Sequence, residues 1–170
     1  MGQRMLATGF LGLAFTLSSG AARAAAEELV MPPAGAKMLL EFRADGVQIY
    51  VCESKGQAHA WRFVGPEAAL FDSEGRQVGT HGSGPSWKLS DGSSVIGEKA
   101  AQSASPDGHS IPWLLLRVKA HEGKGRLDAA SWIRRFETRG GAEPAGGCDA
   151  VHAGESARMR YSATYQFFGS

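Results

Sequence analysis

The residues best suited to chemistry gather in one glycine-rich stretch in the middle of the chain, residues 79–93. It contains His81, Trp87 and Asp91, set among glycine, serine and proline residues that favour turns. Glycine loses more backbone freedom on folding than any other residue, so an ordered loop of this composition often serves function rather than stability. We therefore predict that residues 79–93 form a ligand-binding loop.

A metal ion or a hydrolytic reaction is the chemical alternative for the same stretch. His81 and Asp91 are the pair that a metal site would use, because imidazole and carboxylate are common metal ligands. A nucleophilic Ser83 or Ser86 beside His81 is a weaker hypothesis, since the GxSxG pattern of a nucleophile elbow is absent. No cofactor is predicted, because a phosphate cradle at Gly84-Pro85 would need a helix after it and the flanks indicate strands.

Two tryptophans and one arginine extend the set of candidate site residues. Trp87 and Trp113 are either core residues or partly exposed platforms on which a sugar ring could stack. Arg134 alternates onto the same strand face as Trp132 and Phe136. An arginine on such a face needs a carboxylate or carbonyl partner if it is buried.

Length and charge limit the class of protein. The chain has 170 residues, enough for one domain with a sizeable core. Its 18 basic residues nearly balance its 17 acidic residues. A nucleic-acid binder would carry a basic stripe, so we do not expect nucleic acid as a partner.

The N-terminus predicts export. Arg4 precedes the apolar residues 5–17, and Ala22-Arg23-Ala24 offers a small-x-small cleavage site. The apolar run is too short to span a membrane comfortably, and no later run is long enough. The mature protein is therefore predicted to be soluble and either periplasmic or secreted. The predicted parts are a signal peptide (1–24), a linker (25–37) and a single β domain (38–170).

Two cysteines, Cys52 and Cys148, fit this compartment. An even number of cysteines in an exported domain favours a disulfide. A metal site formed with histidine is the alternative, although the sequence has no CxxC or HxxxH spacing.

The remaining chain shows the two-residue periodicity of short strands. Residues 38–42 and 47–51 alternate around Asp45-Gly46, which predicts a hairpin with a two-residue turn. Residues 111–118 are apolar on both faces, as in a fully buried strand. Residues 158–168 alternate between apolar and polar side chains, as in an antiparallel sheet with one wet face. We predict an all-β fold, a single antiparallel β-sandwich or barrel of about eight to ten short strands.

Several short motifs lie one after another along residues 38–168. They are Gly46-Val-Gln-Ile-Tyr-Val-Cys52, Trp61-Arg-Phe63, the 79–93 stretch, Ile111-Pro-Trp-Leu-Leu-Leu116, Thr138-Arg-Gly-Gly141, Gly147-Cys-Asp149 and Tyr161-Ser-Ala-Thr-Tyr-Gln-Phe167. With these motifs the chain resembles a family of exported bacterial and fungal proteins of unassigned function. Some members are labelled malate dehydrogenase, but this chain has neither a GxGxxG after a strand nor a βαβ pattern. The resemblance implies export and one β domain, and it brings no known catalytic residues.

Two functions follow as hypotheses. The first is a non-enzymatic binding or cell-envelope protein whose ligand is a small molecule or a glycan. The second is an exported enzyme, metal-assisted or hydrolytic, centred on His81 and Asp91. The candidate ligand-binding residues are His81, Trp87, Asp91, Trp113 and Arg134.

Overall fold

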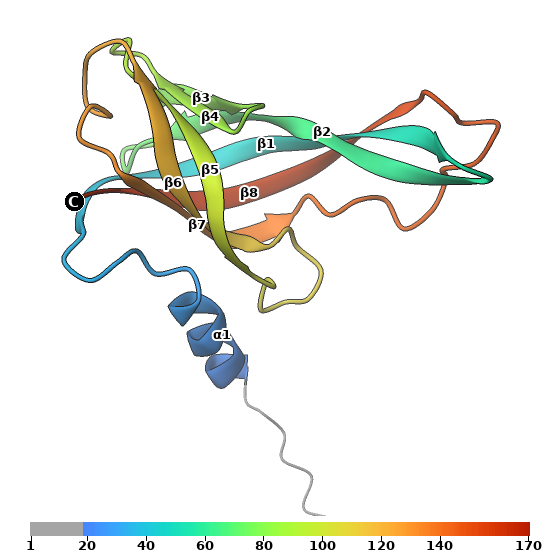
Figure 1. The fold of residues 1–170 in the computed structure, drawn as a ribbon, viewed down its shortest axis with the longest axis horizontal. Helices are drawn as coiled ribbons and strands as arrows, with labels where there is room; N and C mark the ends of the chain where they lie inside the picture. The colour runs from blue at the N-terminus through green and yellow to red at the C-terminus, as the bar shows by residue number, and fades with distance from the viewer. Residues whose placement is uncertain (1–18) are drawn as a thin grey trace, which may run out of the picture.

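The computed structural model describes residues 19–170, which form a ring of antiparallel strands preceded by one short helix (Figure 1). The elements are α1 (Ser19–Glu28), β1 (Lys37–Lys55), β2 (Ala58–Phe71), β3 (Gln77–Gly82), β4 (Ser86–Leu89), β5 (Ser94–Ser103), β6 (Trp113–Glu122), β7 (Trp132–Gly140) and β8 (Ser156–Gly169). Each strand pairs with the next, and β8 pairs with β1, so that the sheet closes on itself. The predicted all-β antiparallel fold is confirmed. The apolar run of the predicted signal peptide lies outside the described residues.

The predicted turn at Asp45-Gly46 is wrong, because β1 runs straight through these residues for its full 19 residues. Gly46 instead allows the neighbouring strand β2 to lie close to β1. A Cβ atom at this position would lie 2.1 Å from the carbonyl oxygen of Glu67 and 2.5 Å from the Cα atom of Ala68. Only glycine lets β1 and β2 pack this closely, so the residue that suggested a turn maintains a continuous strand.

The inside of the ring is an aromatic core. The last strand supplies Tyr161, Tyr165 and Phe167 from one face, as its alternation predicted, and all three are buried. Trp87 meets the rings of Tyr165 and Phe167 edge to face, with centroids 5.4 and 6.1 Å away. This arrangement suits the quadrupoles of aromatic rings and fixes the position of β4 against β8.

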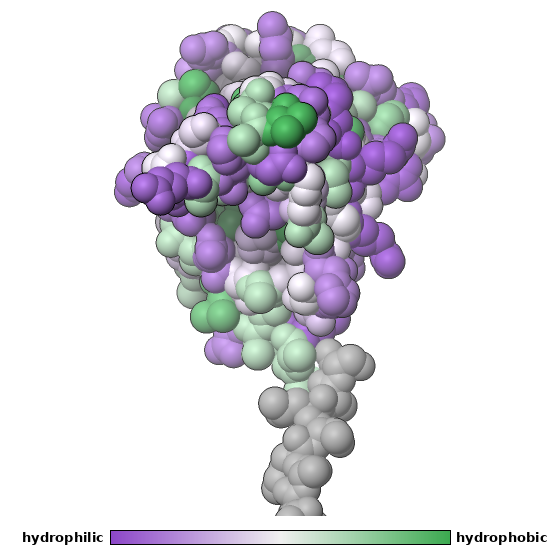
Figure 2. All heavy atoms as spheres, turned by 90° about the vertical axis from the view of Figure 1, so that its right-hand side faces the viewer, coloured by the Kyte–Doolittle hydropathy of each residue, from purple (hydrophilic) through white to green (hydrophobic). Residues whose placement is uncertain are grey.

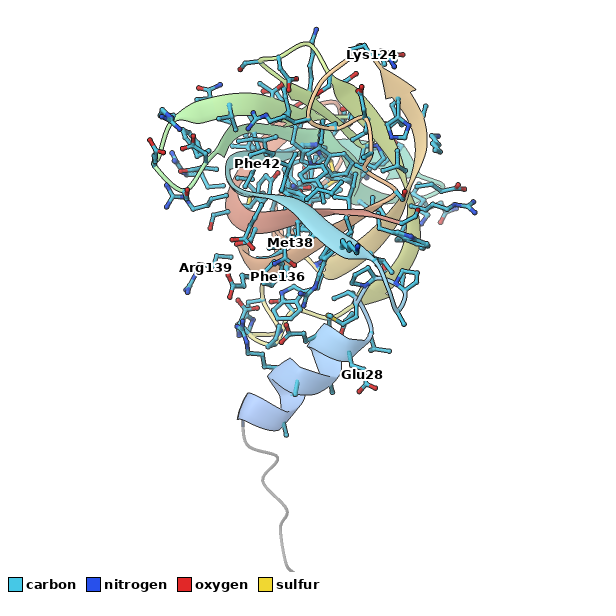
Figure 3. The ribbon with its side chains drawn as sticks, turned by 90° about the vertical axis from the view of Figure 1, so that its left-hand side faces the viewer. Glu28, Met38, Phe42, Lys124, Phe136 and Arg139 are labelled. Atoms are coloured by element: carbon cyan, nitrogen blue, oxygen red, sulfur yellow. A yellow bond between two sulfur atoms is a disulfide. The ribbon has the colours of Figure 1, made fainter. Side chains whose placement is uncertain are left out.

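A second, smaller core lies outside the ring, beneath α1. Ala26 and Val30 cover Trp113, Leu115 and Phe136 of the outer sheet face. Figure 3 shows Phe136 between the ring and α1. This layer explains why β6 is apolar on both faces, as predicted. The helix itself was not predicted, because its residues were assigned to the signal peptide and the linker.

Arg134 lies buried in this outer layer and has a carboxylate partner, one of the two kinds of partner that a buried arginine on this face was predicted to need. Its side chain is 5% exposed, and it contacts Glu27 of α1 at 3.0 Å. A second hydrogen bond runs from the guanidinium to Gln166, at 3.2 Å. Arg134 therefore anchors α1 to the sheet rather than facing a ligand.

A two-stranded arm extends from the ring. It consists of the tip of the β1–β2 hairpin, residues 50–63, and the adjacent residues 142–158 (Figure 1). The predicted disulfide between Cys52 and Cys148 is confirmed and joins these two parts. The indole of Trp61 adds a hydrogen bond to the Gly146 carbonyl at 2.9 Å. Viewed from the side of the arm, the surface is mainly hydrophilic (Figure 2).

No helix between residues 19 and 170 has the length and apolar character needed to cross a membrane.

Candidate functional site

The predicted ligand-binding loop is largely a β-hairpin. Residues 79–93 contain the end of β3, the turn at residues 83–85, strand β4 and the turn before β5. His81 pairs with Trp87 across this hairpin, and both side chains point into the ring, where they are 3% and 1% exposed. The interpretation of Trp87 as a core residue agrees with this position, and the interpretation as an exposed platform does not. Burial likewise leaves His81 out of reach of a ligand in the solvent.

The His81 ring is held as a neutral imidazole. Its Nδ1–H group donates to the Ser86 carbonyl oxygen at 2.8 Å, and its ring stacks on Trp87 with centroids 4.4 Å apart. Burial away from water lowers the pKa of His81 to about 3, although the hydrogen bond to Ser86 opposes the shift. At neutral pH this side chain is an uncharged part of the core.

His81 and Asp91 are not brought together. In the β3–β4 ladder, His81 lies near the 83–85 turn, whereas Asp91 follows Leu89 at the opposite end of the hairpin. The Asp91 carboxylate accepts hydrogen bonds from Ser93 and from the Arg126 backbone, which hold its pKa well below its usual range. Within residues 19–170, no three His, Cys, Asp or Glu side chains group as metal ligands would. Asp91 is a turn residue that also fixes the β6–β7 connection.

The buried His81 predicts a specific loss of stability in acid. In the unfolded chain its pKa is about 6.5, so between that pH and about 3 only the unfolded state is protonated. Its stabilising contribution is therefore complete above about pH 6.5 and decreases as the pH falls, by at most about 1.4 kcal/mol per pH unit. Urea unfolding at pH 7 and pH 5 measures this slope.

The matched control is His81→Gln. Between pH 7 and pH 5 the free energy of unfolding of this variant should depend less steeply on pH, because one titrating proton has been removed. By NMR, His81 should keep constant ring shifts down to pH 4. His152 should titrate above the usual range, because its hydrogen bond to Asp149 raises its pKa. An ordinary titration of His81 near pH 6.5 would contradict its burial.

A groove on the outer side of the ring offers a better site. Its cavity has a volume of about 350 Å³ and lies between α1, the loop after β5 and the outward faces of β1, β8 and β7. Its polar lining residues are Arg23, Arg43, Ser105, Asp107, Glu137, Thr138, Arg139, Ser162 and Thr164. Arg43 stands opposite Thr164 in the β1–β8 ladder, so neighbouring strands present these two groups in one row. Residues with hydroxyl, guanidinium and carboxylate groups thus line the same space.

A β-bulge in β7 directs the groove's acidic group outward. Glu137 and Thr138 together oppose the single residue Ala163, because the ladder shifts between Phe136 and Arg139. Thr138 turns inward and donates to the Ile111 carbonyl at 2.6 Å, whereas Glu137 has a φ of 51° and a carboxylate that is 46% exposed. A positive φ at a residue other than glycine costs roughly 1–3 kcal/mol, and such strain is often found at functional sites.

Some of the charged side chains in the groove have an ion-pair partner and others do not. Arg43 and Arg139 form no ion pair with a carboxylate in the described part of the chain. Figure 3 shows Arg139 at the outer side of the molecule, beyond Phe136. Glu137 pairs with Arg23 of α1 at 2.8 Å. The groove can therefore donate from the guanidiniums of Arg43 and Arg139 and accept at Glu137, whereas its second carboxylate, Asp107, already accepts hydrogen bonds from Ser105, His109 and Ser110.

Trp113 joins the groove to the outer core. Its side chain is 1% exposed, in agreement with the core interpretation, and its Nε1 atom is buried without a hydrogen-bond partner in the described protein. The Arg23 guanidinium covers the indole, with its central carbon 5.5 Å from the ring centroid. The Arg23 side chain therefore covers the Trp113 indole and pairs with Glu137 in the groove.

Sequence reasoning missed Arg43, Glu137 and Arg139. They lie on strands far apart in the chain, and the bulge breaks the alternation from which a face is inferred. The one available signal is the Thr138-Arg-Gly-Gly141 motif, whose two glycines both adopt positive φ and mark an irregular strand end.

Comparison with known proteins gives one match. A family model described as "Protein of unknown function (DUF3455)" covers residues 33–169. No curated protein and no solved structure matches the chain. Nothing in these comparisons supports a malate dehydrogenase.

Proposed function

Since the chain belongs to the DUF3455 family, whose function is unknown, we propose its function from the groove: an exported protein that binds a small, hydroxyl-rich molecule of the glycan class. The observation that carries the proposal is the row of Arg43, Thr164 and Glu137 across three neighbouring strands. Planar guanidinium and carboxylate groups pair well with the adjacent hydroxyls of a sugar, because each offers two hydrogen-bonding atoms side by side.

Export is the second part of the proposal. The disulfide supports it, because such bonds persist in oxidising compartments. Cleavage after Ala24 would remove Arg23 and leave Ala26, Glu27 and Val30, which attach α1 to the sheet. Glu137 would then lose its ion-pair partner, and the Trp113 ring would lose the guanidinium that covers it. Processing therefore uncovers both an acceptor and an aromatic face for stacking.

Removing both free guanidiniums should abolish binding. For Arg43→Ala/Arg139→Ala we expect at least a tenfold loss of affinity for glucose, galactose or glucuronate, because each hydrogen bond from a charged group contributes about 1.5–3 kcal/mol. The melting temperature should change little, since both side chains are exposed. Binding is measured by NMR shift changes on the chain that begins at residue 25.

The matched control is Arg117→Ala/Lys119→Ala, which removes the same charge from an exposed part of β6. It should bind as the unchanged protein does. If none of the three sugars shifts the resonances of residues around Glu137, the groove is not a glycan site. If both double variants weaken binding equally, the effect is one of net charge and the assignment to the groove fails.

A further inference from the structure

The inside of the ring contains a buried arginine that has no carboxylate partner. Arg135 is 8% exposed, and its Nε and one Nη atom both donate to the Pro112 carbonyl oxygen, at 3.2 and 2.8 Å. No carboxylate of residues 19–170 forms an ion pair with it. The adjacent Arg134, equally buried, has Glu27. A buried guanidinium with one carbonyl oxygen keeps most of its charge uncompensated, at a considerable cost in stability.

Three further hydrogen-bond donors surround this charge. Tyr165 lies directly opposite Arg135 in the β7–β8 ladder. Its hydroxyl, the Tyr161 hydroxyl and the Gln48 amide nitrogen are all buried without a hydrogen-bond partner in the described protein. The Tyr161 hydroxyl adjoins both Tyr165 and Gln48, and the charge of Arg135 acts on both tyrosines. We call these four residues the interior donor cluster.

Buried donors without acceptors are rare in folded proteins, because each loses its hydrogen bonds to water on burial. Here two hydroxyls and an amide lie near a positive charge, whereas another buried tyrosine, Tyr50, already donates its own hydroxyl to the Gly141 carbonyl at 2.8 Å. A partner that accepts several hydrogen bonds and carries negative charge would satisfy these groups together.

We propose that the interior donor cluster binds a small anion, which accepts hydrogen bonds from Arg135, Tyr161, Tyr165 and Gln48. The surrounding backbone limits its size. At Gly141, a Cβ atom would lie 2.7 Å from the Cβ atom of Tyr161 and 3.0 Å from Cγ of Gln48, so residue 141 packs directly on the cluster. We therefore expect the ligand to be a halide or a single carboxylate or phosphate group. This site is inside the ring and separate from the outer groove.

The experiment measures thermal unfolding of the full chain in sodium chloride, sodium formate and sodium phosphate, with the sodium salt of HEPES, a bulky sulfonate, added to hold the ionic strength constant. An anion that binds only the folded state raises the melting temperature as its concentration increases. At 100 times the dissociation constant we expect a rise on the order of 5 °C. The anion with the largest shift identifies the class of ligand, and the absence of a shift with all three overturns the proposal.

The decisive variant is Tyr161→Phe/Tyr165→Phe, which deletes two hydroxyls and keeps both rings. We expect the anion-dependent rise to disappear, while the melting temperature in the HEPES salt alone stays equal or increases. The matched control is Tyr50→Phe, whose deleted hydroxyl already has a partner, and it should keep the rise. Arg43→Ala/Arg139→Ala should also keep it, which separates this site from the groove. A double phenylalanine variant that keeps the full rise would overturn the proposal.

Discussion

Replacing Trp87 by alanine is expected to lower the free energy of unfolding by about 3 to 5 kcal/mol. The indole is 1% exposed and contacts His81, Tyr165 and Phe167. Its removal would leave a cavity that these rings cannot fill, because they are held in place by strands β3 and β8. Urea unfolding at pH 7 measures the change.

Trp61→Ala is the matched control, because it deletes the same side chain from a partly exposed position in the arm. Its effect should be clearly smaller. A loss below about 1 kcal/mol for Trp87→Ala, the range of surface substitutions, would contradict the core position of the indole. It would restore the interpretation of residues 79–93 as a ligand-binding loop.

Loss of the disulfide should have a comparable effect. For Cys52→Ser/Cys148→Ser we expect the free energy of unfolding to fall by about 4 to 5 kcal/mol in the chain-entropy model. The bond spans 96 positions, so its removal frees a long loop in the unfolded state. Chemical unfolding of the oxidised protein and of the variant gives the difference.

The wild-type protein under reducing conditions is the control for this variant, and its stability should match that of the serine variant. Reductant should leave the variant unchanged. Thiol titration of the unfolded, unreduced protein should find no reactive thiol. Two thiols per chain would show that the bond does not form.

The confirmed predictions concern side chains whose burial can be inferred from the pattern of residues in their own strand. The final strand alternates strictly, and its Tyr161, Tyr165 and Phe167 face the core. Residues 111–118 predicted a strand covered on both sides, and α1 supplies the outer cover. The need of Arg134 for a carboxylate was also predictable, but its partner was not. Glu27 is 107 positions away, and no local pattern connects the two residues.

The predictions that failed depend on partners elsewhere in the chain. Asp45-Gly46 has the composition of a turn, yet the close approach of Glu67 and Ala68 from β2 gives Gly46 a different role. The glycine-rich stretch was predicted to bind a ligand from its composition, which does not reveal that β3 and β4 pair on both sides and form part of the ring. The groove requires strands β1, β7 and β8 and a bulge, none of which a single stretch of sequence reveals.

The pairing of the first strand with the last determines when this chain can fold. Residues 37–51 of β1 pair with residues 156–169 of β8, so the sheet cannot close until β8 has been synthesised. Contacts between such distant residues form slowly, because the entropy of a long loop must be lost before they stabilise anything. The ring therefore stays open while the strands before β8 are being synthesised. For the exported protein that we propose, this topology would favour transport of the chain before it folds.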